Sequence, residues 1–130
     1  MDPVFLTLDE VIEIHREMIA QYGGSDGIRD DGLLESAVAT PQAGFGGEYV
    51  HSNIFEMSAA YLFHIVKNHP FIDGNKRTGA MAAFVFLKIN KLTLVADEDQ
   101  FERIVIDVAE SKIEKREIAE FLKKHCKKSR

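Results

Sequence analysis

The sequence predicts an all-α protein, in which about six helices pack around one central buried helix to form a single domain over residues 1–130. Apolar residues recur every three or four positions through most of the chain, which is the spacing of one helix face. Residues 80–87 are apolar on every face, as expected of a helix surrounded by protein. The one extended stretch, residues 92–95, is too short to form a sheet by itself.

The first helix is predicted to begin after Thr7. Thr7 and Glu10 have the spacing of a capping box, and Gly23 and Gly24 end the helical pattern. His15 lies on the apolar face of this helix. A single histidine in that position is more often a hydrogen-bonded core residue than a ligand, and we interpret His15 in this way.

A turn-rich linker and a short second helix follow. Asp30 or Asp31 is of the residue type that caps a helix, and Pro41 comes after the end of the helical pattern. We expect Arg29 and Glu35 to form an ordinary ion pair at or near the surface.

Residues 42–51 show no regular period and contain three glycines, which predicts a mobile loop. Phe45 and Tyr49 flank Gly46 and Gly47. Such a loop either covers an active site or connects two helices while its aromatic residues pack on the core. The sequence leaves both interpretations open.

The next helix is predicted to begin at a second capping box, formed by Asn53 and Glu56, and to end near Asn68. Pro70 disfavours helical backbone at the residue before it, so His69 is presented at a helix terminus. No His-x-x-x-His pair occurs in the chain, which argues against a zinc site.

Two more helices are predicted after the central one. Residues 97–100 are expected to cap a helix that continues to about residue 109, and a break at residues 111–114 precedes the last helix. The lysines that follow are expected to form a solvated helix end, where cations interact favourably with the helix dipole.

Composition and charge exclude several classes of protein. The net charge of −5 does not favour nucleic acid as a direct partner. No apolar stretch is long enough for a membrane span, and no signal peptide is recognisable. The single cysteine, Cys126, cannot form an internal disulfide, which fits a reducing compartment. We therefore expect a cytoplasmic protein.

Polar residues are concentrated just before the central helix. Gly74 provides a flexible turn, and Asn75 is expected to be the N-cap of the helix. Unpaired N–H groups at a helix N-terminus attract anions. Lys76 and Arg77 add two cationic groups at the same place, and the planar guanidinium is suited to phosphate oxygens.

Two further residues complete this set. Asp73 is suited to a hard divalent cation such as Mg²⁺, and His69 is able to take a proton near neutral pH. A phosphate site, a metal ligand and a base together predict phosphoryl or nucleotidyl transfer. The bland interpretation is a polar loop that only caps a helix. It is disfavoured because charged groups this dense beside a buried helix are costly unless they are used.

Residues 69–77, which we call the signature segment, resemble the signature of the Fic/Doc family, His-x-Phe-x-(Asp/Glu)-Gly-Asn-(Gly/Lys)-Arg. Seven positions match: His69, Phe71, Asp73, Gly74, Asn75, Lys76 and Arg77. Family members that transfer AMP carry a second glycine and a later arginine where this chain has Lys76 and Ala80. Lysine at the first of these positions is typical of the Doc branch, the death-on-curing toxins, which move the terminal phosphate of ATP to a protein hydroxyl.

The resemblance implies an all-α Fic/Doc fold and a role for each signature residue. His69 is implied to be the general base for a target Ser or Thr hydroxyl, and Asp73 to bind Mg²⁺. The implied phosphate-binding residues of the ATP site are Gly74, Asn75, Lys76 and Arg77. Of these, Lys76 and Arg77 are implied to stabilise the charge of the transferring group. Asn75 is implied to act through its backbone N–H or its side chain, and Phe71 to be structural.

The resemblance also implies partners. A flap that holds the target segment is expected in the loop before the third helix, at Phe45, Gly46, Gly47 and Tyr49. The expected target is elongation factor Tu, with arrest of translation, and the expected inhibitor is a Phd-like antitoxin supplied in trans. Two alternatives stay open: AMP transfer, and a non-catalytic member that acts by binding its antitoxin.

Overall fold

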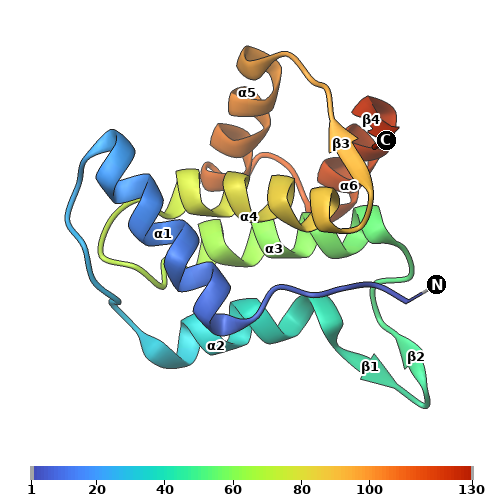
Figure 1. Cartoon of the computed structure of the whole chain (residues 1–130), viewed down its shortest axis with the longest axis horizontal. Coiled ribbons are helices and arrows are strands. Elements are labelled where there is room, and N and C mark those ends of the chain that lie inside the picture. Colours follow the sequence, from blue (N-terminus) through green and yellow to red (C-terminus); the bar gives the residue numbers. More distant parts are fainter. Residues whose placement is uncertain (1, 130) are drawn as a thin grey trace.

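The computed structural model describes residues 2–129, and within them it confirms a mostly helical fold with six α-helices (Figure 1). Local capping explains where most of these helices begin. The helices are α1 (Leu8–Tyr22), α2 (Asp31–Ala39), α3 (Ile54–Asn68), α4 (Asn75–Ile89), α5 (Glu98–Ala109) and α6 (Lys115–His125). A short 3₁₀ turn, η1 (Thr40–Gln42), follows α2.

Two helices, α3 and α4, run side by side through the centre of the molecule (Figure 1). None of residues 80–87 is exposed, as predicted for the central helix. The two helices approach closely at Gly79, where an added Cβ would lie 2.8 Å from Cγ2 of Val66 and 3.2 Å from the carbonyl oxygen of Leu62. Only glycine fits this crossing without a shift of α3.

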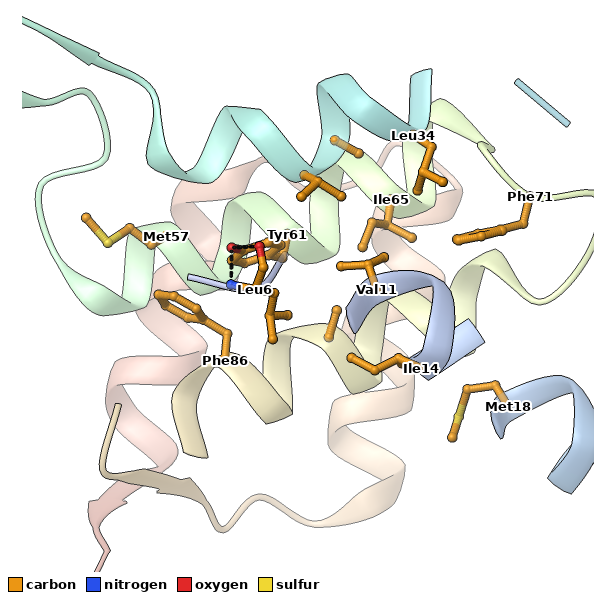
Figure 2. Packing of buried hydrophobic residues seen from close by; sticks show 13 residues of the cluster. Leu6, Val11, Ile14, Met18, Leu34, Met57, Tyr61, Ile65, Phe71 and Phe86 are labelled. Carbon is orange, nitrogen blue, oxygen red and sulfur yellow. Dashed lines mark hydrogen bonds between the residues drawn. The ribbon is translucent and has the colours of Figure 1, made fainter. Parts of the chain in front are cut away.

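The core consists of two clusters on opposite sides of this central pair. The first joins α1 and α2 to α3 and α4, and includes Val11, Leu34, Tyr61 and Phe86 (Figure 2). In it the hydroxyl oxygen of Tyr61 accepts a hydrogen bond of 2.9 Å from the backbone N–H of Leu6, so the one polar atom of this buried ring is satisfied. The second cluster joins α5 and α6 to the other side of α3 and α4.

The local signals at the helix starts are borne out in part. The capping box of Thr7 and Glu10 is present, and Asp30 caps α2 through the N–H of Leu33. Asn53 accepts from the N–H of Glu56 as predicted, whereas the Glu56 carboxylate bonds to Ser52 and to the Asn53 side-chain amide. Asp97 precedes α5 but makes no side-chain capping bond.

Two predictions about irregular segments were only partly correct. The loop at residues 42–51 contains a hairpin, in which β1 (Gly44–Phe45) pairs antiparallel with β2 (Glu48–Tyr49). As expected, Lys123 and Lys124 are exposed in the last turn of α6. The tail does not remain helical to its end, because β4 (Cys126–Lys128) leaves α6 and pairs antiparallel with β3 (Leu92–Leu94). The second pairing joins segments more than 30 residues apart, so no local pattern reveals it.

Over residues 2–129, no helix combines the length and the apolar character that crossing a bilayer requires.

Candidate functional site

The signature segment forms the turn between the two central helices. His69 ends α3 in the left-handed conformation, with φ 48° and ψ 54°, which a non-glycine residue adopts only when its surroundings impose it. Gly74, with φ 77°, precedes the first residue of α4, and a Cβ there would lie 3.1 Å from Cδ1 of Ile19. The left-handed backbone at His69 therefore depends on tertiary contacts, whereas that at Gly74 is one that glycine adopts readily.

Asn75 is not the N-cap that the sequence predicts. Gly74 takes that position, and Asn75 is the first residue of α4, with its side chain buried. Oδ1 of Asn75 accepts from the N–H of Phe71, and Nδ2 donates to the carbonyl oxygen of Phe71, both over 3.0 Å. Nδ2 also lies 3.3 Å from Nδ1 of His69. The carboxamide thus clamps the loop and orients the histidine, and it is turned inward rather than toward solvent.

Arg29 also supports the loop from outside it. Its Nε donates to the carbonyl oxygen of His69 over 2.6 Å and its Nη2 to that of Asn68 over 2.9 Å. The predicted ion pair with Glu35 is absent from the described residues. The last carbonyl groups of a helix have no intrahelical partner, and here the guanidinium fork satisfies two of them, one on each side of the His69 turn.

Residues 23–30, which we call the connector, form the second wall of this region. The N–H groups of Arg29 and Asp30 both donate to the carbonyl oxygen of Pro70, and the N–H of Ile72 donates to that of Gly27. The connector therefore lies along the signature segment in an antiparallel arrangement. The sequence predicts only a turn-rich linker here. The three glycines at positions 23, 24 and 27 indicate a turn-rich segment. They do not indicate that the connector pairs with the signature segment, because that pairing is long-range.

Asp73 is exposed, and both of its carboxylate oxygens accept a backbone hydrogen bond. Oδ1 accepts from the N–H of Gly74 over 2.9 Å, and Oδ2 accepts from the N–H of Ser25 over 3.2 Å. The hydrogen bonds from Ser25 and Gly74 hold the pKa of the Asp73 carboxyl below its usual range, so the group is ionised at neutral pH. Gly24 lets the connector approach this closely, because a Cβ there would lie 2.7 Å from Oδ2 of Asp73.

His15 is a hydrogen-bonded core residue, as predicted. Its ring stacks on the buried Phe71 ring with centroids 3.8 Å apart, and its Nε2 lies 2.8 Å from the carbonyl oxygen of Asp73. A carbonyl oxygen only accepts, so Nε2 is the protonated ring nitrogen. His15 therefore holds the backbone of Asp73 from the core side, while the Asp73 carboxylate stays exposed to solvent.

Lys76 and Arg77 are exposed on the first turn of α4. Neither has a salt bridge or a side-chain hydrogen bond to any residue between 2 and 129. The guanidinium carbon of Arg77 lies 4.5 Å from the centre of the Tyr22 ring, at the end of α1. The first backbone bond of this turn joins the N–H of Thr78 to the carbonyl oxygen of Gly74, so the N–H groups before Thr78 remain unused by the helix. Cationic side chains and unused N–H groups at a helix N-terminus are features that favour an anion.

The structure brings together all of the predicted signature residues and leaves the predicted flap apart from them. In Figure 1 the hairpin β1–β2 extends from the end of α3 that is remote from the signature segment. The side chain of Phe45 is 88% exposed, while Tyr49 is partly covered by Phe5, with ring centroids 5.6 Å apart. Neither hairpin aromatic lies in the core clusters, which leaves Phe45 with no packing role of its own.

A second polar cluster, which sequence reasoning missed, lies between α3 and α6. Nζ of Lys115 is 3.2 Å from Nε2 of His51 and 3.0 Å from Nε2 of His64. Burial and the neighbouring ammonium lower the pKa of His64 to about 4, and the same two causes lower that of His51. Burial also lowers the pKa of Lys115. Residues of this kind far apart in sequence carry no local motif that predicts such a cluster.

Residues 2–129 contain no group of three or more His, Cys, Asp or Glu side chains arranged to hold a metal ion by themselves. Asp73 therefore offers a single carboxylate that is not part of such a group. This suits Mg²⁺, which proteins commonly hold through one or two carboxylates together with substrate phosphates.

Comparison with known proteins finds a family and relatives for this chain. The model of the Fic/DOC family matches residues 5–87, which include the connector and the signature segment. The chain is 45% identical over 78 residues to a protein named Toxin Doc from Mycolicibacterium smegmatis, a match that covers 60% of each chain. It is 32% identical over 116 residues to a protein named Protein kinase doc from Escherichia phage P1, covering 89% of this chain and 90% of that protein.

Proposed function

The chain belongs to the Fic/Doc family, and from that premise we propose that it is a Doc-like toxin with protein kinase activity. It transfers the γ-phosphate of ATP to a serine or threonine hydroxyl of a protein target. The observation that carries this proposal is that Lys76 and Arg77, at the N-terminus of α4, have no salt-bridge partner within residues 2–129 and stand in the same short segment as His69 and the ionised Asp73. The names of the two relatives, a toxin and a protein kinase, agree with it.

Phosphoryl transfer requires a positioned nucleophile and a preorganised set of charges more than it requires covalent chemistry. The imidazole of His69 takes the proton of the target hydroxyl as its oxygen attacks the γ-phosphorus. The bond from this phosphorus to the bridging oxygen breaks, and ADP leaves. Lys76, Arg77 and the N–H groups of the first turn of α4 stabilise the negative charge on the phosphate oxygens.

The residues present fit Mg²⁺. Asp73 is exposed and ionised, and each of its oxygens accepts only one backbone hydrogen bond, which leaves acceptor sites for a hard cation. When bound, the ion supplies charge neutralisation at the nucleotide phosphates. Ser25, Gly74 and His15 hold this carboxylate and its backbone in place for that task.

Lys76 supports γ-phosphate transfer over AMP transfer. In AMP-transferring members a glycine stands at this position, and the lysine side chain occupies space that glycine leaves open. Ala80 also stands where those members carry a second arginine. With one arginine and a lysine, the site is built to receive the terminal phosphate. AMP transfer remains the alternative function, and a non-catalytic member that acts through its antitoxin is the alternative outside enzymology.

The proposed target is elongation factor Tu, with arrest of translation as the outcome, and the proposed inhibitor is a Phd-like antitoxin in trans. The hairpin at Phe45 to Tyr49 is the proposed contact for the target segment, because its exposed Phe45 has no packing role. Movement of this hairpin toward the signature segment, or target binding across the length of α3, is required for that contact.

The test uses purified protein, Mg²⁺ and elongation factor Tu or a bacterial lysate, with ATP labelled at either the α- or the γ-phosphate. We expect label on protein from the γ-phosphate alone, absent with His69→Ala and unchanged with His125→Ala as the matched histidine control. Label from the α-phosphate would establish AMP transfer. Label from neither, with toxicity retained in cells, would support action by binding alone. Coexpression of a candidate antitoxin should restore growth.

A further inference from the structure

Tyr22 is an exposed aromatic residue that the proposed mechanism does not use. It is the last residue of α1, its side chain is 54% exposed, and it belongs to neither core cluster. Its ring lies beneath the guanidinium of Arg77, with 4.5 Å from Cζ to the ring centre. A large ring left this open contributes little to the core, so its contact with Arg77 is its main interaction within the described chain.

The contact restrains Arg77 without neutralising it. An arginine side chain has many rotamers, and ordering them on substrate binding costs conformational entropy. A carboxylate partner would also restrain the side chain, but it would occupy the N–H donors and cancel the charge that a phosphate needs. An aromatic face does neither, because a guanidinium above a ring keeps its N–H donors, which lie in its own plane, available.

The backbone around Tyr22 is tied to the same site. Gly23, with φ 87°, ends α1, and its N–H donates to the carbonyl oxygen of Ile19 over 2.8 Å. Two residues later, the N–H of Ser25 binds the Asp73 carboxylate. The last residue of α1 and the connector that follows it therefore contact Arg77 and Asp73, respectively. The position of the Tyr22 ring is thus coupled to the signature segment.

We propose that Tyr22 is a positioning residue of the phosphotransfer site, whose ring holds the Arg77 guanidinium in place to receive the γ-phosphate of ATP. This inference rests on the proposed function, because it assigns Arg77 to the transferring phosphate. Tyr22 does not touch the reacting atoms, and its hydroxyl has no part in the reaction.

The experiment is a double-mutant cycle on the intact protein with Tyr22→Leu, Arg77→Ala and the combined variant, measured as γ-phosphate transfer to elongation factor Tu. Tyr22→Leu should lower kcat/KM about 3- to 30-fold, the range of a cation–π contact from exposed to desolvated. It should have no further effect in the Arg77→Ala background. Tyr22→Phe, which keeps the ring, should retain wild-type activity, and the thermal midpoint of all variants should stay near that of the wild type.

Three results would overturn the inference. The first is full activity of Tyr22→Leu, the second an equal loss in the Arg77→Ala background, and the third a loss with Tyr22→Phe as large as with Tyr22→Leu. Failure of the proposed function itself is recognised from the label transferred by the wild type. Label from the α-phosphate moves the same cycle to AMP transfer. If the wild type transfers no label, the cycle is measured as equilibrium affinity for ATP with Mg²⁺, where additive effects of the two substitutions would exclude coupling.

Discussion

Histidine and lysine residues occur in two regions of the molecule, the signature segment and the space between α3 and α6, and their surroundings differ. At the signature segment, His69 and Lys76 are exposed, and Lys76 has no salt bridge within residues 2–129. Between α3 and α6, Lys115 lies against two imidazoles, His51 and His64, and all three are buried or half-buried. The same residue types form an open site in one region and a closed contact in the other.

The two regions differ in the partners of their polar side chains. In the closed cluster the ammonium of Lys115 contacts both imidazoles. Burial and this ammonium lower the pKa values of His51 and His64, and burial lowers that of Lys115. At the signature segment the fixing is done by neighbours: Asn75, Arg29 and His15 bind backbone atoms of the loop. The side chains proposed to do chemistry are left with unused donors and acceptors, which is what binding a substrate requires.

The largest effect is expected at His69. His69→Ala should lower phosphate transfer by about 10²- to 10⁴-fold, the usual contribution of a general base, while the free energy of unfolding changes by less than about 0.5 kcal/mol. The reason is that His69 is exposed, and its ring is held only by the 3.3 Å contact between its Nδ1 and Nδ2 of Asn75 within residues 2–129. Kinetic assays and urea unfolding measure the two quantities. A folded His69→Ala variant that still transfers phosphate would remove His69 from the catalytic role.

Asn75 should behave differently, although it belongs to the same signature. Asn75→Ala leaves the buried N–H and carbonyl of Phe71 without their partners, which should cost about 1–3 kcal/mol of unfolding free energy as well as activity. Urea unfolding of Asn75→Ala beside Lys76→Ala provides the comparison, since Lys76→Ala should reduce activity alone. Equal stability of the two variants would show that the carboxamide clamp contributes nothing to the fold.

The closed cluster should make stability depend on pH. The pKa of His64 is about 4 in the folded protein and about 6.5 when unfolded. Below pH 6.5, His64 is therefore protonated in the unfolded chain but stays neutral in the folded chain until about pH 4. The free energy of unfolding should therefore fall by about 1–3 kcal/mol between pH 7 and pH 4.5. The lowered pKa of His51 contributes in the same direction. Urea midpoints across this range measure it. His64→Leu should flatten the curve.

The smallest effect is expected from Arg29→Lys. Lysine keeps the positive charge but has no fork to bind the carbonyl oxygens of both Asn68 and His69. We expect a loss of about 1 kcal/mol in unfolding free energy and a several-fold decrease in transfer, because the His69 turn is less well held. Glu35→Gln is the control, since the structure gives Glu35 no contact with Arg29. A larger loss with Glu35→Gln would restore the ion pair predicted from the sequence.

Much of the fold could be predicted because its signals are local. Three helices begin at capping residues that the sequence identifies, Thr7, Asp30 and Asn53. The stretch at residues 80–87, apolar on every face, indicates the central helix. Predictions failed where a residue had two possible roles. Asn75 has the residue type of an N-cap, but the left-handed Gly74 takes that position and frees the carboxamide to clamp Phe71. Arg29 found helix carbonyls rather than a carboxylate.

The sequence by itself determined the residue types of the signature segment, their spacing and the helices on either side, since capping, proline restriction and apolar periodicity act over a few positions. Only the tertiary structure decided what holds that segment in place. The connector, Arg29, His15 and Tyr22 reach it from 40 or more residues away. Contacts at that separation depend on how α1 packs against α4, and packing is a property of the whole core rather than of any local pattern.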